Sequence, residues 1–569
     1  MKKKIILFLL MLTIHHASDA QDNSAQQGTL ALKKVPNMPH NFFLTQLPNG
    51  LEVLVIEDRS VPLATIEWVV KNGAFVQTPD LEGLAHLYEH MFFKANRDYP
   101  SQEAYLERVN ELGIVFNGTT SDERVNYYIT LNKSKLTEGL EFMNSAARYP
   151  LFLKEEMERE NVVVAGEFQR NESNPVFFLL RDMRKKLWGK EFSRKNTIGE
   201  YPVILSATPE IMKDIQNRYY YPNNSMMVVA GDVDHNTVIA EIQRIYGDWR
   251  PSTFKIFEKY PIPEFEPIRY TQTFITENEN AQVPILLMSW HGPDTRKDLK
   301  STYAADVFSF ILQQQNSKLQ KALVETGLAY QVSVSYQTQK YTGPIQIFLV
   351  PNPAKMEEAM KVLNEHIAQW DNPDYFTDEQ MQTAKEMLDI EDQYSKEQTS
   401  DYVHTVTYWW ASASLEYYTN YINNIKAVSR EDINNYIRHY IKGKPYVAGL
   451  LVSPGMNKMM PLDKIFPVAG DMENMKLAIK GNSIVFDEKA GQTITALKEL
   501  NRLNEGKKLN IRVNAPTKAA ADASVKQLKE KLKAAGLPET AYTVTQNVKA
   551  DKTLTAQEKE KQNTVMFSF

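Results

Sequence analysis

Apolar runs separated by turn signals predict strands and helices from about residue 42 onward. LPNGLEVLVIED places Asn-Gly between two apolar runs, which is typical of a β-hairpin. ATIEWVVKNGAF alternates as a strand does, and VNYYITL and SMMVVAGDV also have strand patterns. Helical patterns occur between them in LEGLAHLYEHMFF, EEMERENVVVAGEFQ and NTVIAEIQRIYGDW. This order predicts a mixed α+β fold.

A weak internal repeat divides the region into two. The predicted helix at 208–219 leads into YYPNNSMMVVAGDV, and one of equal length at 429–440 leads into IKGKPYVAGLLV. Each begins at a hydroxyl residue suited to an N-cap and ends in tyrosine before a Val-Ala-Gly strand. Four prolines crowd the stretch between the two halves, as in a linker. We expect two related domains at 41–250 and 269–455, joined by a linker at 251–268.

The N-terminus has the order of an export signal. Lys2, Lys3 and Lys4 precede a ten-residue apolar run, and the small residues Ser18 and Ala20 follow it. We expect a signal peptide at 1–20, cleaved before Gln21, and a flexible polar leader at 21–40. An uncleaved anchor is the alternative, but the run is too short to span a bilayer. No later segment is long and apolar enough either, so we expect a periplasmic protein without a membrane span.

The tail at 461–569 is rich in Lys and Ala and is expected to be a separate small α+β domain. Its predicted strands are SIVFD, LNIRVNA and NTVMFSF, with helices in ITALKELNRLN and ASVKQLKEKLKAAG. This order faintly resembles an OmpA-like peptidoglycan-associated domain. We favour the alternative of a docking or structural module.

Composition excludes several kinds of chemistry. The chain has 65 Lys and Arg against 70 Asp and Glu, so its charge offers no general reason to bind nucleic acid. The absence of cysteine excludes disulfides, thiolate metal sites and cysteine nucleophiles. Neither a G-x-S-x-G motif nor a G-x-x-x-x-G-K-[ST] phosphate loop occurs. Any metal must therefore be held by nitrogen and oxygen.

Two of the ten histidines stand four residues apart, His86 and His90, with Glu89 between them. Positions i and i+4 lie on one face of a helix, so both imidazoles can reach one cation, as in a zinc site. A carboxylate beside a metal-bound water can accept its proton, and H-x-x-E-H is the inverted zincin motif. The alternative is a helix whose two histidines bond to polar neighbours.

Zinc needs a third protein ligand and one open position. EEMERENVVVAGEFQ places Glu160 and Glu167 seven residues apart, on one side of a helix after two turns. A carboxylate on a largely apolar helix is costly unless it is paired or bound to metal. The alternative is that both are surface glutamates. We expect Glu156, Glu158 and Glu172, which lie on the same predicted helix, to be surface glutamates.

The H-x-x-E-H helix, followed about 77 residues later by Glu167, resembles the pitrilysin/insulinase zinc peptidases, which include mitochondrial processing peptidase. The resemblance covers about residues 42–453 and implies one Zn²⁺ per chain, held by His86, His90 and Glu167. It implies Glu89 as the general base and Glu160 as a second acidic residue that supports the site.

FNGTTSDERVNYY resembles the N-A-x-T strand segment of the family, with Gly118 in place of the usual alanine. This implies that Asn117 and Thr120 lie near an edge strand that pairs with the substrate backbone.

The second half departs from the family pattern L-R-E-x-x-G-L-A-Y. SKLQKALVETGLAYQVSVSY contains Tyr330, but the arginine position falls on Leu323 or Val324. The resemblance implies a substrate-binding role for Tyr330. The alternative, which we favour, is that this segment is only core helix and strand.

The closed chamber of the family uses four such domains, whereas two are expected here. We therefore expect a second peptidase-like subunit that supplies Arg and Tyr, or else a homodimer. The sequence predicts an exported zinc metalloendopeptidase that hydrolyses unstructured peptides. A non-catalytic peptide-binding or structural subunit of a peptidase-like complex is the alternative.

Overall fold

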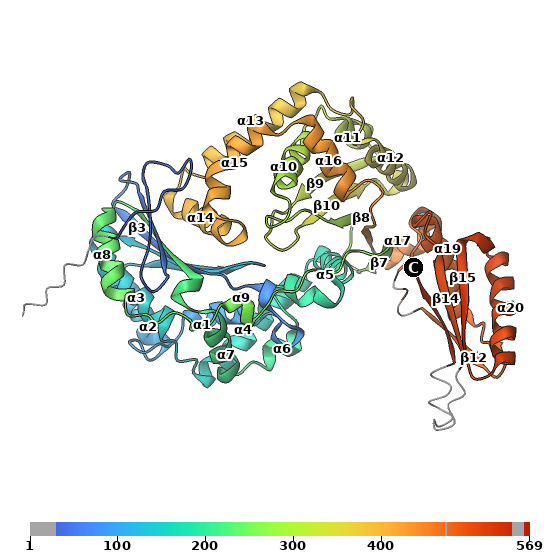
Figure 1. Ribbon diagram of the computed structural model, residues 1–569, viewed down its shortest axis with the longest axis horizontal. Helices are drawn as coiled ribbons and strands as arrows, with labels where there is room; N and C mark the ends of the chain where they lie inside the picture. Colours follow the sequence, from blue (N-terminus) through green and yellow to red (C-terminus); the bar gives the residue numbers. More distant parts are fainter. Residues whose placement is uncertain (1–29, 471, 473–474, 549–562) are drawn as a thin grey trace, which may run out of the picture.

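The computed structural model describes residues 30–470, 472, 475–548 and 563–569, which fold around three β-sheets (Figure 1). The expected signal peptide at 1–20 and residues 21–29 of the expected leader lie outside the described residues. The rest of the leader is packed rather than free, because the amide of Lys33 donates to the carbonyl oxygen of Leu44 at 2.7 Å. Within the described ranges, no helix combines the length and the apolar character needed to cross a bilayer.

The first sheet has the strand order β1-β2-β6-β3-β5-β4. Its strands are β1 (Phe42–Gln46), β2 (Glu52–Glu57), β3 (Leu63–Val70), β4 (Val115–Thr120), β5 (Val125–Asn132) and β6 (Ser225–Gly231). The Asn-Gly turn joins β1 to β2, and Gly50 adopts φ +89°, which favours glycine. β6 is buried along its whole length, whereas β4 is an edge strand that pairs with β5.

Helices from the first half of the chain pack on one face of this sheet around the buried Trp68 and Tyr88. The helices of this half are α1 (Leu84–Phe92), α2 (Gln102–Leu112), α3 (Leu136–Arg148), α4 (Lys154–Glu172), α5 (Pro175–Trp188), α6 (Tyr201–Leu205), α7 (Pro209–Tyr219), α8 (His235–Tyr246) and α9 (Ile256–Lys259). Thr208 caps α7 through the amide of Ile211, as its hydroxyl predicts.

The second sheet repeats the topology of the first without a counterpart of β1. Its order is β7-β11-β8-β10-β9, and the parallel pair β7–β11 corresponds to β2–β6. The strands are β7 (Gln272–Glu277), β8 (Ile285–His291), β9 (Ala329–Tyr336), β10 (Pro344–Pro351) and β11 (Val447–Val452). The edge strand β9 therefore takes the place that β4 has in the first sheet, and the two halves are related as the repeat predicts.

Helices α10 to α18 belong to the second half. They are α10 (Leu299–Gln313), α11 (Lys318–Gln320), α12 (Met356–Gln369), α13 (Asp378–Tyr394), α14 (Thr399–Ser412), α15 (Leu415–Ala427), α16 (Arg430–Tyr440), α17 (Pro454–Met459) and α18 (Leu462–Ile465). Ser429 caps α16 and exchanges hydrogen bonds with Asp432, a capping box.

The two halves exchange one helix each (Figure 1). From the second half, α14 packs Val403 and Val406 against the face of the first sheet that its own helices leave uncovered, on the side toward the second half. From the first half, α5 packs Leu179 and Met183 against the second sheet. Because each sheet buries one face with a helix of the other half, the two halves form one packed body.

The tail forms the third sheet, in the order β13-β12-β16-β14-β15. Its elements are β12 (Lys476–Lys480), β13 (Ser483–Ile484), α19 (Glu488–Leu503), β14 (Leu509–Ala515), α20 (Lys518–Ala534), β15 (Tyr542–Val548) and β16 (Thr564–Ser568). The patterns did not predict β12 and β15, whose sequences KLAIK and YTVTQNV bury few side chains. The amide of Thr273 joins this unit to the second sheet by donating to the Ala469 carbonyl oxygen at 2.9 Å.

Candidate metal centre

Helix α1 carries the H-x-x-E-H residues and begins at Gly83, which has φ +85°. A Cβ at Gly83 would lie 2.6 Å from the Cα of Gly199, so the helix can approach that segment only because Gly83 has no side chain. Leu84, Leu87 and Met91 are buried in the first core. Burial of this face leaves His86 and His90 turned toward α4.

The structure brings His86, His90 and Glu167 together. The Nε2 atoms of the two histidines lie 3.2 Å apart. Oε2 of Glu167, on α4, lies 3.7 Å from Nε2 of His86 and 3.8 Å from Nε2 of His90. Ligands at about 2.05 Å from a tetrahedral zinc ion are separated by about 3.3 Å. The two nitrogens and one oxygen thus have the identity and approximate spacing of three zinc ligands.

Glu160 contacts the opposite side of His90. Its Oε1 lies 2.8 Å from Nδ1 of His90, and its Oε2 lies 2.7 Å from Nζ of Lys94. A carboxylate at Nδ1 keeps the imidazole proton there and leaves the Nε2 lone pair free for a metal. Burial disfavours the charged form of Glu160, but the hydrogen bonds from His90 and Lys94 outweigh it and lower its pKa.

The two histidines differ in their electrostatic surroundings. Burial and the neighbouring His90 lower the pKa of His86 to about 4, so His86 is neutral at pH 7, as a metal ligand must be. Nδ1 of His86 is buried and has no hydrogen-bond partner among the described residues. Burial also opposes protonation of His90, but its hydrogen bond to Glu160 and the nearby carboxylates raise its pKa.

Glu89 lies between α1 and the edge strand β4. It is 7% exposed, and its Oε2 accepts the Thr120 hydroxyl at 2.6 Å. Burial raises the pKa of Glu89, and the bond from Thr120 partly offsets this. A Cβ on Gly118 would lie 2.9 Å from Cγ of Glu89. Gly118 therefore lies directly against this carboxylate, and a side chain at that position would require one of the two to shift.

Asn117 is exposed on β4, and its Oδ1 accepts the amide of Gly118 at 2.9 Å. Tyr330 lies on the corresponding edge strand β9 of the other sheet and is 60% exposed. Among the described residues, no hydrogen bond, ion pair or ring contact joins Tyr330 to the histidine cluster. Leu323, one candidate for the missing arginine position, lies in the core of the second half, within the π-helix η6 (Lys321–Glu325).

One expectation for α4 is wrong. Glu156 is not a surface glutamate: it is 4% exposed and accepts the amides of Ala95 at 3.0 Å and Gln102 at 2.9 Å. The spacing of apolar residues within one helix could not reveal that α4 turns Glu156 toward the chain that follows α1.

Lys94 is a site residue that the motif analysis missed. It is buried beside Glu160, which it neutralises together with His90. Lys94 lies two residues beyond the end of α1 at Phe92, so helical spacing from His90 does not place it, and only the packing of α4 against this segment reveals the contact.

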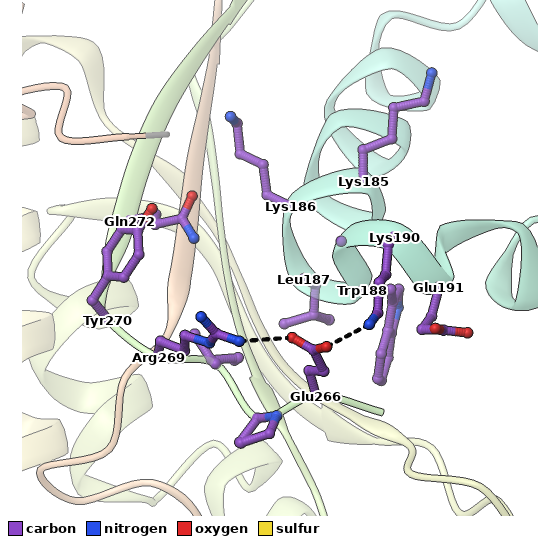
Figure 2. Close-up of a pocket in the computed structure, with 13 residues that line it drawn as sticks. Lys185, Lys186, Leu187, Trp188, Lys190, Glu191, Glu266, Arg269, Tyr270 and Gln272 are labelled. Carbon is purple, nitrogen blue, oxygen red and sulfur yellow. Dashed lines mark hydrogen bonds and ion pairs between the residues drawn. The ribbon is translucent and has the colours of Figure 1, made fainter. Parts of the chain in front are cut away.

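A cavity of about 370 Å³ lies away from this cluster, between the end of α5 and the segment that enters β7 (Figure 2). Glu266 projects between Lys190 and Arg269 and pairs with both, at 2.5 and 3.0 Å. No member of the histidine cluster lines this cavity, and its paired charges give no reason to place the chemistry there.

Two family models match the chain in succession. "Insulinase (Peptidase family M16)" matches residues 52–199, and "Peptidase M16 inactive domain" matches residues 206–388. The chain belongs to peptidase family M16. The predicted pitrilysin/insulinase membership and the predicted fold class, two mixed α/β domains and a small C-terminal domain, are confirmed. Neither M16 model reaches the tail, and the OmpA-like resemblance is unsupported.

Similar proteins agree with this membership. An uncharacterized zinc protease of Rickettsia felis is 25% identical over 353 residues, which are 62% of this chain and 83% of that protein. A protease structure from Helicobacter pylori superposes with a TM-score of 0.63 at 19% identity, covering 72% of this chain and 98% of that one. The periplasmic protease PqqL of Escherichia coli gives 0.61 at 16% identity, covering 75% of this chain and 49% of PqqL. The two M16 domains here thus have the architecture of one half of the four-domain chamber, which has the shape of a clam-shell.

Proposed function

We propose that this M16 chain is a zinc-dependent endopeptidase that cleaves unstructured peptides. One observation carries the proposal: Nε2 of His86 and Nε2 of His90 lie 3.2 Å apart, with Oε2 of Glu167 at 3.7 and 3.8 Å. His86, His90 and Glu167 would hold the zinc ion. When bound, the ion supplies Lewis acidity and lowers the pKa of water toward about 7.

Glu89 is the general base of the proposed reaction. Thr120 occupies its Oε2, so Oε1 takes the proton of the attacking water and later delivers it to the leaving amine nitrogen. Glu160 and Lys94 keep the Nδ1 proton of His90 in place. The free edge of β4, at Asn117, aligns an extended peptide by strand addition beside Glu89. An unstructured peptide has its backbone N–H and C=O groups free for this pairing.

We further propose that a second peptidase-like chain completes the chamber. Leu323 is buried and Val324 is apolar, so neither alternative at the missing arginine position supplies a cation. The chain also spans only about half of PqqL. The partner would supply Arg and Tyr, and a homodimer is the alternative, in which Tyr330 would bind substrate. Export to the periplasm remains part of this proposal, supported by the N-terminal sequence.

The test is a metal analysis of the purified chain together with a digest of mixed unstructured peptides, read by mass spectrometry. We expect about one zinc per chain and cleavage that a chelator abolishes and zinc restores. Glu89→Gln should retain the zinc and lose at least about 10²-fold in turnover. Glu158→Gln, on the exposed side of α4, is the matched control and should cleave normally.

Three outcomes would redirect the proposal. Unchanged turnover in Glu89→Gln would exclude Glu89 as the base. Peptide binding without zinc-dependent cleavage, alone and with a co-expressed partner, would favour the non-catalytic subunit. Full activity as an isolated homodimer would remove the hetero-partner.

A further inference from the structure

The turn that follows Thr120 is held by the second half of the chain. Glu123, in this turn between β4 and β5, is 2% exposed. Its Oε2 accepts the amide of Lys340 and its Oε1 accepts the amide of Tyr341, both at 2.7 Å. Lys340 and Tyr341 belong to the loop 337–343 between β9 and β10, which we call the docking loop. Both oxygens of a first-half carboxylate therefore bind the backbone of the second half.

Charged neighbours compensate for the burial of Glu123. Burial raises the pKa of Glu123, and Lys195 together with the two amides opposes this. Lys195, in the 3-10 helix η4 (Gly189–Lys195), donates from Nζ to the carbonyl oxygens of Tyr341 at 3.1 Å and Thr342 at 3.0 Å. Its Nζ also lies 3.6 Å from Oδ2 of Asp122, the residue before Glu123. Removal of a partner from such a buried, hydrogen-bonded charge is costly.

The docking loop has little freedom to follow a displaced turn. A Cβ on Gly343 would lie 1.7 Å from the carbonyl oxygen of Gln337, so the loop closes tightly on itself. The Tyr341 ring stacks on Phe75 of the first half, with centroids 5.4 Å apart. The Gln339 side chain donates to Oδ2 of Asp122 at 2.7 Å. The loop thus offers the turn a rigid template.

The turn is coupled to the candidate base over a short path. The amide of Ser121 donates to the carbonyl oxygen of Arg124 at 2.9 Å, which closes the turn directly after Thr120. Thr120 in turn donates to Glu89. A displacement of the turn must therefore move the Thr120 hydroxyl, and a displacement near 1 Å can cost up to about 10²-fold in rate.

We propose that Glu123 is a positioning residue through which the docking loop of the M16 inactive domain fixes β4 and, through Thr120, the carboxylate of Glu89. The inference rests on the proposed function. Arg124 also anchors the turn, because its Nη1 donates to the carbonyl oxygen of His404 on α14 at 2.8 Å. Loss of the Glu123 contacts should therefore shift the turn by a small distance, while Arg124 still holds it against α14.

The test combines kinetics with hydrogen exchange on the full chain. In Glu123→Gln an NH₂ group replaces one acceptor and faces a backbone donor. We expect a kcat lower by about tenfold at unchanged KM and zinc content. Asp182→Asn is the matched control, because Asp182 accepts the Thr276 hydroxyl at 2.7 Å between the same two halves but lies on α5. Its kcat should stay within about twofold of the unaltered chain.

A double-mutant cycle distinguishes an effect of Glu123 on the position of Thr120 from a general loss of stability. If Glu123 acts through Thr120, Thr120→Val combined with Glu123→Gln should be no slower than Thr120→Val alone. The amides of residues 115–120 should exchange faster in Glu123→Gln and at normal rates in Asp182→Asn. Should Glu123→Gln fail to fold, Asp122→Asn weakens the contact with Gln339 at a partly exposed position and should show the same pattern.

Additive losses in the cycle, or unaltered exchange of residues 115–120, would overturn the inference. An unaltered chain that cleaves no peptide would instead refute the proposed function. In that case the exchange comparison alone decides whether the docking loop holds β4.

Discussion

The hydroxyl of Thr120 donates to Oε2 of Glu89 at 2.6 Å and so joins the edge strand β4 to helix α1. The bond links the strand proposed to align the peptide with the carboxylate proposed to move the proton. Because β4 also continues into the turn that Glu123 anchors, the position of Glu89 depends on two elements besides its own helix.

Removal of this hydroxyl should slow the reaction without removing the metal. We expect Thr120→Val to lower kcat by about tenfold, because the Glu89 carboxylate loses the donor that orients it. Thr120→Ser keeps the hydroxyl and should recover most of the rate. Steady-state kinetics with a fluorogenic peptide, at measured zinc content, distinguishes the two variants. Equal rates for Val and Ser would show that the bond has no role in turnover.

Addition of one methyl group at Gly118 should disturb the same carboxylate. The new Cβ would lie 2.9 Å from Cγ and 3.0 Å from Oε1 of Glu89, so the side chain must shift. We expect Gly118→Ala to lower kcat about tenfold with little change in KM. Gly166→Ala is the control on α4, where a Cβ meets no atom within 4 Å. It should be active and more stable to urea by up to about 1 kcal/mol.

Loss of the Glu160 charge should weaken zinc binding. Glu160→Gln removes the carboxylate that holds Nδ1 of His90 and leaves Lys94 without its anion. We expect zinc affinity to fall about 10- to 100-fold, as measured by competition with a chromophoric chelator. Glu158→Gln, two residues earlier on the exposed face, should bind zinc normally. Normal affinity in Glu160→Gln would argue against the proposed supporting role.

A buried acid in the second half should make stability depend on pH. Burial raises the pKa of Asp306 from 3.8 to about 7, although the Tyr421 hydroxyl, at 2.7 Å, partly opposes this. The folded chain therefore binds the proton more tightly than the unfolded chain. The stabilisation is complete below about pH 4 and is lost as the pH rises through 7.

Because the Asp306 side chain keeps some solvent exposure, we expect the free energy of unfolding to fall by only about 2 kcal/mol between pH 4 and pH 7. Urea unfolding, followed by tryptophan fluorescence, measures it. Asp306→Asn keeps an acceptor for Tyr421 and should abolish this contribution to the slope of the unfolding free energy against pH. Asp378→Asn, an exposed acid in the same half, should leave the slope unaltered. An unchanged slope in Asp306→Asn would contradict the assignment.

Local patterns predicted several strands and helices of the first M16 domain, and fewer of the second, because each pattern depends on neighbours along one helix or strand. The i, i+4 spacing of His86 and His90 brings their Nε2 atoms within 3.2 Å once the helix forms. The alternation in ATIEWVVKNGAF became β3, and Asn-Gly made the turn before β2. The strand β15 of the tail was missed because only Tyr542 is buried along it, whereas β12 was missed although KLAIK alternates as a strand does.

The sequence by itself determined the helix that carries both histidines, the two candidate carboxylates on the second helix, and the repeat of one topology in both halves. Only the tertiary structure decided that Glu167 faces the Nε2 atoms, that Glu160 faces Nδ1, that Glu156 is buried, and that Glu123 meets the docking loop. The reason is physical. Periodicity orients a side chain relative to its own helix or strand, whereas the packing of distant segments decides which atom it meets.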